Sequence, residues 1–430
     1  MKYVIYGAGK RGKITLELIG KDNVYAFIDR DNEKIGTIYC DVPVVALDAL
    51  KHVKKDFLYV ISPYKENEEI KSFLKKKGIV NCLKLQQIDI VLKQCKKQME
   101  AKLVCLEERS AVVICGISIS SLLIYENLKK MGHCPIIAVE EEKDLLCYSF
   151  LEKSFDIKLF KNVIDECDVV IYLESDLKEE SIKKITHKTK RINIKEVFEE
   201  QLEESEEIQK YKNIHSAERC FIVATGPSLR VEDLNLLEKN NEICISMNRI
   251  YNIFHKTTWR PNYYMIQDLK MIDDLKETIV ELDLPVKFVS GASNEYWEQK
   301  KSRSSIKFNY VNLIEMDKMP FFSERVDKCI YEGMTVTYAC LQMAMYMGFK
   351  EIYLLGLDHN YSNNLYAGSN HFAGYDMDKT IRLNTVYIEQ NELAYVSARK
   401  YAEQNGIKVY NATRGGKLEV FERKDFDSLF

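Results

Sequence analysis

The feature that most constrains the fold is a short apolar run, followed by a turn of small residues and a helical stretch, which begins near residues 3, 111 and 220. Apolar runs that alternate with helical stretches are typical of α/β folds with parallel sheets. A chain of 430 residues also exceeds what a single hydrophobic core usually organises. The sequence therefore predicts an α/β protein of three Rossmann-like units with mainly parallel sheets, the last of them the largest.

The repeats set the predicted domain boundaries. We expect a Rossmann-like domain of the nucleotide-binding type over residues 1–100 and a second, degenerate copy over residues 101–195. A polar and acidic helical linker follows over residues 196–213. The remaining residues, 214–430, are expected to form the catalytic domain.

Charge and cysteine usage exclude several classes of function. The 62 Lys and Arg residues against 65 Asp and Glu residues give a net charge of −3, so bulk attraction to nucleic acid is not expected. The twelve cysteines contain no C-x-x-C pair of the kind found in zinc or dithiol sites, and many unpaired thiols fit a reducing compartment.

The chain's start and its hydropathy indicate where the protein works. Its N-terminus is typical of a strand rather than a signal peptide, and no apolar run approaches the roughly 18 residues of a membrane-spanning helix. We therefore expect a cytoplasmic protein with at most peripheral membrane contact, at the inner face of the membrane.

The first repeat carries the pattern of a dinucleotide-binding βαβ unit. An apolar run over residues 3–6 leads into Gly7-Ala8-Gly9-Lys10-Arg11-Gly12, then a helix, then a strand that ends at Asp29. The glycines allow a tight turn and close approach to phosphate, and the acid can hold a ribose. Gly7, Gly9, Gly12 and Asp29 are therefore predicted as a second nucleotide site. With the strands near residues 42–44 and 58–62, this part resembles the Rossmann-like N-terminal domain of bacterial sugar acetyltransferases.

The second repeat keeps only Gly116 of the glycine pattern. This loss favours a structural or assembly role over a ligand site in the second copy.

The third repeat brings polar residues to the ends of successive predicted strands. Thr225-Gly226-Pro227-Ser228 follows the first, Asn248 the second, and Gln267-Asp268 the third. Because the carboxyl ends of parallel strands meet at one edge of a sheet, these residues are predicted to share a rim that binds a nucleotide.

Further candidates lie later in the chain. Thr335 and Thr337 precede an apolar helix, and a nearly all-apolar strand then ends in Gly356-Leu357-Asp358-His359. Near the C-terminus, Arg414-Gly415-Gly416 is predicted to turn a guanidinium toward the same rim, where it would suit a carboxylate or phosphate.

These motifs, together with the string from Gly348 to Asp358 and Asn370-His371, resemble the bacterial CMP-sialic acid-dependent sialyltransferases over about residues 214–430. The same superfamily includes motility-associated flagellin glycosyltransferases and the archaeal hydroxymethyl-dihydropterin pyrophosphokinase. The resemblance implies a variant Rossmann-like transferase that inverts the anomeric centre of its sugar donor and requires no metal or other cofactor.

The resemblance also implies roles for individual residues. Nucleotide contacts fall to Thr225, Gly226, Ser228, Asn248, Thr335, Thr337 and Asp358, and two tyrosines that donate to the departing phosphate match Tyr361 and Tyr366. The catalytic base matches His371, in a glycine-flanked loop typical of lids. A histidine suits this role because its pKa lies near neutrality. His359 is the competing candidate and is otherwise predicted, with Asn370 and Arg414, to contact substrate.

Three functions follow as hypotheses. The first is transfer of a nonulosonic acid such as sialic acid from a CMP-linked donor to an oligosaccharide or glycolipid acceptor, in surface polysaccharide biosynthesis. The second is a pyrophosphokinase of the pterin type, in which Asp268 and Asp358 would bind Mg²⁺–ATP. The third is a non-catalytic scaffold that binds a nucleotide sugar. The sugar, its linkage, the acceptor and the formation of a homo-oligomer stay open.

Overall fold

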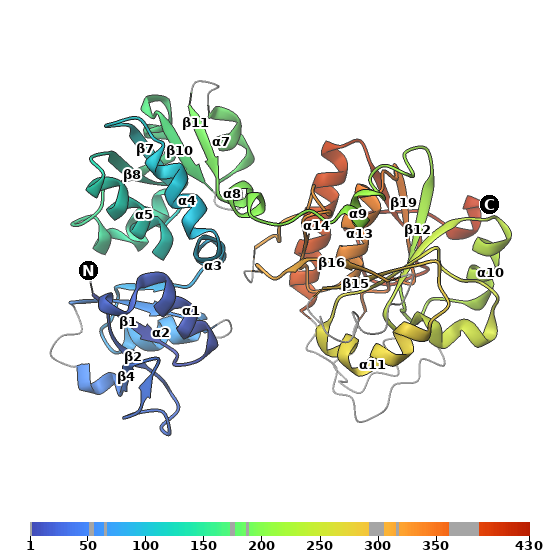
Figure 1. Ribbon diagram of the computed structural model, residues 1–430, viewed down its shortest axis with the longest axis horizontal. Helices are drawn as coiled ribbons and strands as arrows, with labels where there is room; N and C mark the ends of the chain where they lie inside the picture. The colour runs from blue at the N-terminus through green and yellow to red at the C-terminus, as the bar shows by residue number, and fades with distance from the viewer. Residues whose placement is uncertain are drawn as a thin grey trace. The chain divides into compact units, whose positions relative to one another are not determined.

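The computed structural model describes residues 2–50, 56–63, 67–172, 177–185, 189–291, 305–314, 318–360 and 387–430. They form two compact units, Met1–Gln201 (unit 1) and Leu202–Phe430 (unit 2) (Figure 1). Both units are α/β with mostly parallel sheets, which confirms the predicted fold class. Within the described ranges, no helix is both long enough and apolar enough to cross a membrane.

Unit 1 contains a first sheet built around the N-terminal strand. In spatial order its strands are β3 (Ile38–Tyr39), β4 (Val42–Val45), β2 (Val24–Ile28), β1 (Lys2–Tyr6), β5 (Phe57–Ile61) and β6 (Cys82–Lys84). The described pairs are parallel apart from the short β3–β4 ribbon. Helices α1 (Lys10–Ile19) and α2 (Asn67–Lys76) connect these strands, and Ile70 and Leu74 of α2 pack on Val4, Tyr59 and Ile61 of the sheet.

A second sheet in unit 1 has the same strand order as the first, apart from the antiparallel edge strand β3. Its order is β11 (Lys190–Asn193), β10 (Val169–Tyr172), β7 (Ala111–Cys115), β8 (Cys134–Val139) and β9 (Ile157–Leu159). In both sheets the first strand is central, with the next strands on one side and the last on the other. The remaining helices of unit 1 are α3 (Gln87–Gln94), α4 (Lys96–Val104), α5 (Ile119–Lys130), α6 (Glu142–Cys147), α7 (Glu179–Lys184) and α8 (Ile194–Glu200).

A buried carboxylate joins the two halves of unit 1. Asp89, on the first turn of α3, is fully buried and accepts hydrogen bonds from the backbone N–H of Gln86 (2.9 Å) and of Ser120 (2.8 Å). Ser120 lies in the first turn of α5, where a nucleotide-binding unit would hold a phosphate. Burial raises the pKa of Asp89 to about 6, although bonds from Gln86, Ser120 and Ser118 oppose the rise.

Asp89 should make the stability of unit 1 depend on pH. Its pKa in the folded chain, about 6, lies above the unfolded value of about 4. The folded state therefore binds its proton more tightly, and stability is highest below pH ~4 and falls as the pH rises through ~6. We expect the wild type to lose roughly 2–3 kcal/mol across this range relative to Asp89→Asn, measured by calorimetry. Asp22→Asn, at an exposed aspartate, is the control; parallel curves for wild type and Asp89→Asn would contradict the assignment.

Unit 2 is organised around one long sheet. Its order is β16 (Ser305–Phe308), β15 (Val286–Ser290), β14 (Tyr263–Ile266), β13 (Ile243–Met247), β12 (Arg219–Val223), β19 (Glu351–Leu355), β20 (Lys408–Asn411) and β21 (Glu422–Arg423). Strands β17 (Tyr310–Val311) and β18 (Ile330–Tyr331) form a separate parallel pair. The helices are α9 (Glu206–Gln209), α10 (Val231–Lys239), α11 (Leu269–Glu281), α13 (Val336–Tyr346) and α14 (Ile388–Gln404).

Short 3₁₀ segments complete the secondary structure of the described residues. They are Lys21–Asn23, Leu47–Leu50, Ser149–Leu151, Phe160–Asn162, Ile164–Glu166, Asn248–Lys256 and Phe426–Leu429.

Helices cover both faces of the long sheet, because its central strands are apolar on both sides. Ile222 and Leu354 face one side and pack with α13 and α14, which lie next to each other in Figure 1. Phe221 and Leu355 face the other side and pack with α10 and α11. Every residue of α13 is buried, in keeping with its mostly apolar sequence, and its buried polar residues include Thr337 and Gln342.

The segment predicted as a helical linker is divided between the units. Helix α8 belongs to unit 1, whereas residues from Leu202 onward belong to unit 2. Ile208 of α9 is fully buried in the core of unit 2, and the Asn213 N–H donates to the carbonyl of Tyr346 (3.1 Å). The remaining domain boundaries stay predictions.

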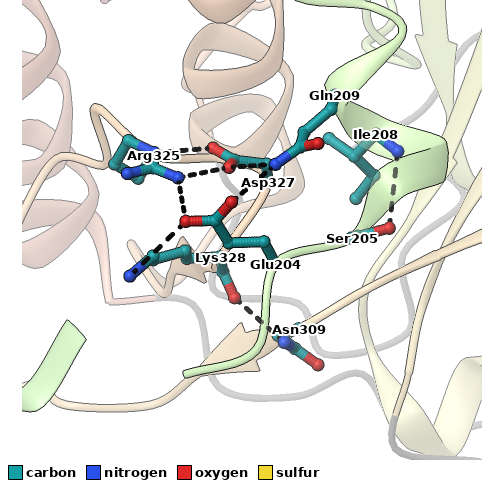
Figure 2. Close-up of polar contacts among 8 residues, drawn as sticks. All are labelled: Glu204, Ser205, Ile208, Gln209, Asn309, Arg325, Asp327 and Lys328. Atoms are coloured by element: carbon teal, nitrogen blue, oxygen red, sulfur yellow. Dashed lines mark hydrogen bonds and ion pairs between the residues drawn. The ribbon is translucent and has the colours of Figure 1, made fainter. Parts of the chain in front are cut away.

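A polar cluster fixes residues 204–209 to a distant loop of unit 2 (Figure 2). Arg325 donates to Glu204 (2.6 Å) and to both oxygens of Asp327 (3.0 and 2.7 Å), and the Ser205 N–H donates to the Asp327 carbonyl (2.8 Å). Gln209 adds a bond to Asp327 (3.4 Å). Burial opposes ionisation of Asp327, but its hydrogen bonds to Arg325 and Gln209 lower its pKa overall. The cluster therefore holds an ionised, buried carboxylate in unit 2.

Candidate functional site

The sheet of unit 2 has a topological switch point, at which the order of the strands reverses. Strands β13 to β16 extend on one side of β12, and β19 to β21 extend on the other. The Ala224 N–H donates to Leu355 and the Gly226 N–H to Gly356, each at 2.8 Å, so the two strand ends stay paired. Open α/β sheets bind ligands at the carboxyl edge beside such a switch point.

A cavity of about 120 Å³ opens at this edge. Its lining brings together most of the nucleotide-binding residues predicted from sequence. They are Thr225, Gly226, Pro227, Asn248, Thr335, Thr337, Gly356 and Asp358, joined by the predicted substrate residue His359 and by Ala224, Met247, Val336, Leu357 and Asn360.

The turn after β12 is tied to Asp358. The Asp358 Oδ2 atom accepts hydrogen bonds from the Ser228 N–H (3.2 Å) and the Ser228 hydroxyl (2.8 Å). A Cβ atom on Gly226 would lie 2.1 Å from this oxygen and 2.4 Å from the carbonyl oxygen of Gly356. Glycine is therefore required at 226, and the Ser228 hydroxyl serves the protein as well as any ligand.

Asp358 is also held by the C-terminal Gly-Gly turn. The Lys417 N–H donates to the Asp358 carbonyl (2.8 Å), and a Cβ atom on Gly416 would lie 2.6 Å from that carbonyl oxygen. The Arg-Gly-Gly turn thus reaches the predicted rim through its backbone.

The first turn of α13 faces the cavity. Thr335 caps this helix by accepting from the Thr337 N–H (3.3 Å), and the Thr337 hydroxyl donates to Met247 Sδ (3.5 Å). Gly333 must be a glycine, because a Cβ atom there would lie 2.2 Å from the Tyr338 ring. The N-terminus of a buried helix carries partial positive charge, which favours an anion in the cavity.

Asn248 occupies a backbone conformation that favours asparagine or glycine. Its φ is +51°, in the left-handed region, and its carbonyl accepts from the Tyr264 hydroxyl (2.7 Å). The side chain lines the cavity, where its amide can donate to and accept from a nucleotide base or phosphate.

His359 is enclosed by protein. Its residue is 4% exposed, its ring lies edge-on to Tyr395, and Nε2 is 3.4 Å from a Glu392 carboxylate oxygen. Burial lowers the pKa of His359, although Glu392 opposes this effect. A neutral, packed ring is better suited to positioning than to exchanging protons with solvent.

Four of the predicted residues that the structure describes lie outside the cavity lining, namely Gln267, Asp268, Arg414 and Ser228, the last of which is bonded to Asp358. Gln267 is 7% exposed, and among the described residues its Oε1 atom has no hydrogen-bond partner. Asp268 caps α11 by accepting from the Met271 N–H (2.8 Å). Arg414 donates to both carboxylate oxygens of Asp233 (2.7 Å each) and to Asp427 (2.6 Å), so its guanidinium is paired with protein carboxylates. A substrate role for Arg414 would require it to exchange one of these partners.

Four predicted residues lie outside the described residues. They are the catalytic candidates Tyr361, Tyr366 and His371 and the substrate candidate Asn370. Their roles stay predictions.

The predicted second nucleotide site is brought together in unit 1. Gly7, Gly9, Gly12 and Asp29 all line a cavity of about 390 Å³ at the carboxyl edge of the first sheet.

Sequence reasoning missed a carboxyl group near the rim of unit 2. Burial raises the pKa of Glu332 to about 7, a hydrogen bond from Tyr310 opposes the rise, and the charge of Asp268 adds to it. Only the long-range pairing of β17 with β18 brings Tyr310 to Glu332, so no local pattern could have indicated this contact. The supporting role of Asp233 under Arg414 was missed for the same reason.

Two families match parts of the chain. Residues 189–364 match the family described as 6-hydroxymethylpterin diphosphokinase MptE-like, and residues 1–82 match C2185-like, N-terminal. The MptE-like match, over less than half of the chain, supports the superfamily predicted from sequence. No curated protein matches.

Two solved structures are distantly similar. The MAf glycosyltransferase from Magnetospirillum magneticum AMB-1 aligns with 79% of this chain at 13% identity and a TM-score of 0.36, and the alignment spans 63% of that protein. Dipicolinate synthase, A chain, from Bacillus subtilis aligns with 47% of this chain and 85% of its own at 12% identity, with a TM-score of 0.21. Both are too distant to carry an argument about function.

Proposed function

We propose that unit 2 is an inverting, metal-independent glycosyltransferase that moves a sialic acid-like sugar from a CMP-linked donor to a glycan acceptor in surface polysaccharide biosynthesis. The observation that supports this most is the cavity at the switch point of the sheet. It combines the Thr225–Pro227 turn, the Asn248 side chain and the first turn of α13. These groups supply hydrogen bonds and a helix N-terminus for a nucleoside monophosphate without cationic side chains.

In this proposal the residues divide the work between binding and proton transfer. The α13 N-terminus and the turn after β12 hold the phosphate, and Asn248 orients the nucleotide. Tyr361 and Tyr366 donate to the phosphate as it leaves, and His371 takes the proton of the acceptor hydroxyl. Asp358 positions the turn through Ser228. The proposal places the protein in the cytoplasm, with a glycolipid or oligosaccharide acceptor.

A pterin-type pyrophosphokinase is the second candidate, because the MptE-like match bears the name of that activity. It would need Asp268 and Asp358 to bind Mg²⁺–ATP. Each of these carboxylates already accepts protein donors, Asp268 from the first turn of α11 and Asp358 from Ser228. Asp268 also lies outside the cavity lining. These contacts favour the first candidate.

Ligand-dependent unfolding separates the two candidates. We expect CMP to raise the unfolding temperature without metal, because a ligand that binds only the folded state stabilises it. At a CMP concentration a hundredfold above Kd, the free energy of unfolding should rise by about 2.7 kcal/mol. The measurement is a thermal-shift panel of CMP, CDP, UDP and ATP, each with and without Mg²⁺. A Mg²⁺-dependent response to ATP with no response to CMP would overturn the proposal.

A matched pair of asparagines controls this experiment. Asn248→Gly removes the side chain but keeps the left-handed backbone, so it should abolish the CMP response with little loss of stability. Asn241 also has a left-handed backbone (φ +53°) but is exposed and does not line the cavity. Asn241→Gly should therefore respond to CMP as the wild type does.

A further inference from the structure

The cavity in unit 1 is large enough for an organic ligand. Its volume of about 390 Å³ far exceeds the roughly 30 Å³ that a water molecule occupies, and falls within the range of small-molecule sites. It opens between β1 and β5, where the strand order of the first sheet reverses. This cavity is separate from the candidate site in unit 2.

The glycines of the Gly7–Gly12 turn differ in whether the packing of the protein requires them. A Cβ atom on Gly12 would lie 2.0 Å from the Gly7 carbonyl oxygen, and Gly7 has φ +100°, so the fold itself requires these two. Gly9 has no neighbouring atom within 4 Å of a Cβ position, and its backbone is extended. Protein packing therefore does not explain Gly9, whereas a side chain there would take up space in the cavity.

The lining is strongly basic. Lys10, Arg11, Arg30 and Lys34 contribute to it, against the single carboxylate of Asp29 among the lining residues. Arg30 donates to the Tyr6 hydroxyl (2.9 Å) and Arg11 to the Ser62 carbonyl (2.8 Å), and these bonds help to orient both guanidinium groups. This surplus of positive charge fits a ligand with more than one negative charge.

Asp29 completes the turn. One of its oxygens accepts from the Ala8 N–H (2.8 Å) and from Lys34 (3.2 Å), and the other from the Asp31 N–H (3.0 Å). Apolar groups of Tyr6, Pro63 and Ile70 form the remaining wall, which suits a ring of a base or sugar.

The second sheet of unit 1 provides an internal comparison. It has the same strand order apart from β3, and the corresponding helix N-terminus, that of α5, receives the carboxylate of Asp89. A negative group of the chain itself thus fills the phosphate position in the second sheet. In the first sheet the equivalent position opens into the cavity, and the first turn of α1 contains no acidic residue.

We propose that the cavity of unit 1 binds a nucleoside diphosphate, with its phosphates beside the Gly7–Gly12 turn and the basic side chains. Asp29 shapes the turn that receives the phosphates, and Tyr6, Pro63 and Ile70 contact the nucleoside. This site is independent of the activity proposed for unit 2.

Calorimetric titration of the full-length protein with UDP and with ADP tests this proposal. We expect at least one of them to bind, and Gly9→Val and Arg30→Gln each to raise its Kd by roughly tenfold or more. Lys13→Gln removes a positive charge from an exposed position of α1 outside the cavity and should leave the Kd unchanged. Asn248→Gly, which alters only the site in unit 2, should also leave it unchanged.

The outcomes that overturn the proposal are distinct. They are absence of binding by both nucleotides at millimolar concentration, equally tight binding of inorganic pyrophosphate, or a Kd that neither Gly9→Val nor Arg30→Gln changes. If Asn248→Gly removes the binding instead, the ligand belongs to unit 2 and the proposal for unit 1 fails. Arg30→Gln keeps the test valid should Gly9→Val disturb the turn, since circular dichroism shows whether each variant is folded.

Discussion

Gly226→Ala is expected to collapse the candidate site of unit 2. The added methyl group would lie 2.1 Å from Asp358 Oδ2 and 2.4 Å from the Gly356 carbonyl oxygen. Neither atom can easily move, because Asp358 is held by Ser228 and Lys417 and the Gly356 carbonyl accepts from the Gly226 N–H itself. We expect a loss of about 3–5 kcal/mol from the free energy of unfolding, at the upper end for overpacking because backbone pairing is also broken.

Urea unfolding followed by tryptophan fluorescence measures this loss, since both tryptophans of the chain, Trp259 and Trp297, belong to unit 2. Gly406→Ala is the control. Gly406 has φ +65°, but no atom lies within 4 Å of its Cβ position, so only backbone strain of about 1 kcal/mol is expected. Equal losses for the two variants would show that the strand ends are not packed as described.

His371→Ala is expected to abolish sugar transfer while CMP binding persists. The acceptor hydroxyl must lose a proton as it attacks, and removal of a general base typically costs 10²–10⁴-fold in rate. The groups proposed to hold CMP, namely the turn after β12, Asn248 and the first turn of α13, are unchanged in this variant. Turnover with a CMP-linked donor and the CMP-dependent thermal shift are measured on the same preparation.

Two other histidines make this experiment specific. His255 is exposed and does not line the cavity, so His255→Ala should retain full turnover. His359 is the competing base, and its burial against Tyr395 argues for a positioning role. Near-normal turnover of His371→Ala together with loss of turnover in His359→Gln would transfer the role of base to His359.

The parallel α/β architecture could be predicted because it depends on local patterns. Apolar strands followed by turns that contain glycine recur at β1, β7 and β12, and the nearly all-apolar β19 is central as expected of a strand buried on both faces. The antiparallel β3–β4 ribbon and the β17–β18 pair have no comparable local pattern. The β3–β4 ribbon is a hairpin whose two-residue turn, Cys40-Asp41, contains no glycine, whereas the β17–β18 pair depends on which distant strand lies alongside, which periodicity does not encode.

In the candidate site, too, the features that follow from chain order could be predicted and those that depend on remote contacts could not. Thr225, Asn248, Thr335 and Asp358 converge because each follows a strand or begins a helix at one edge of a sheet, which the chain order predicts. Arg414 also lies in a turn near this edge, but its guanidinium pairs with Asp233, 181 positions earlier. The partner that a long side chain contacts depends on residues that are remote in the sequence. For the same reason, sequence could not show that Ser228 and Asp358 bond to each other.

The polar cluster of Figure 2 has a practical consequence for expressing unit 2 on its own. A fragment that starts at residue 214 would lack Glu204, which pairs with Arg325, and Gln209, which bonds to Asp327. It would also lack Ile208, a fully buried residue of the core, and would leave apolar surface uncovered. A fragment that starts at Leu202 keeps all three residues. Unit 2 therefore begins at Leu202, seventeen residues before Arg219, where its first strand starts.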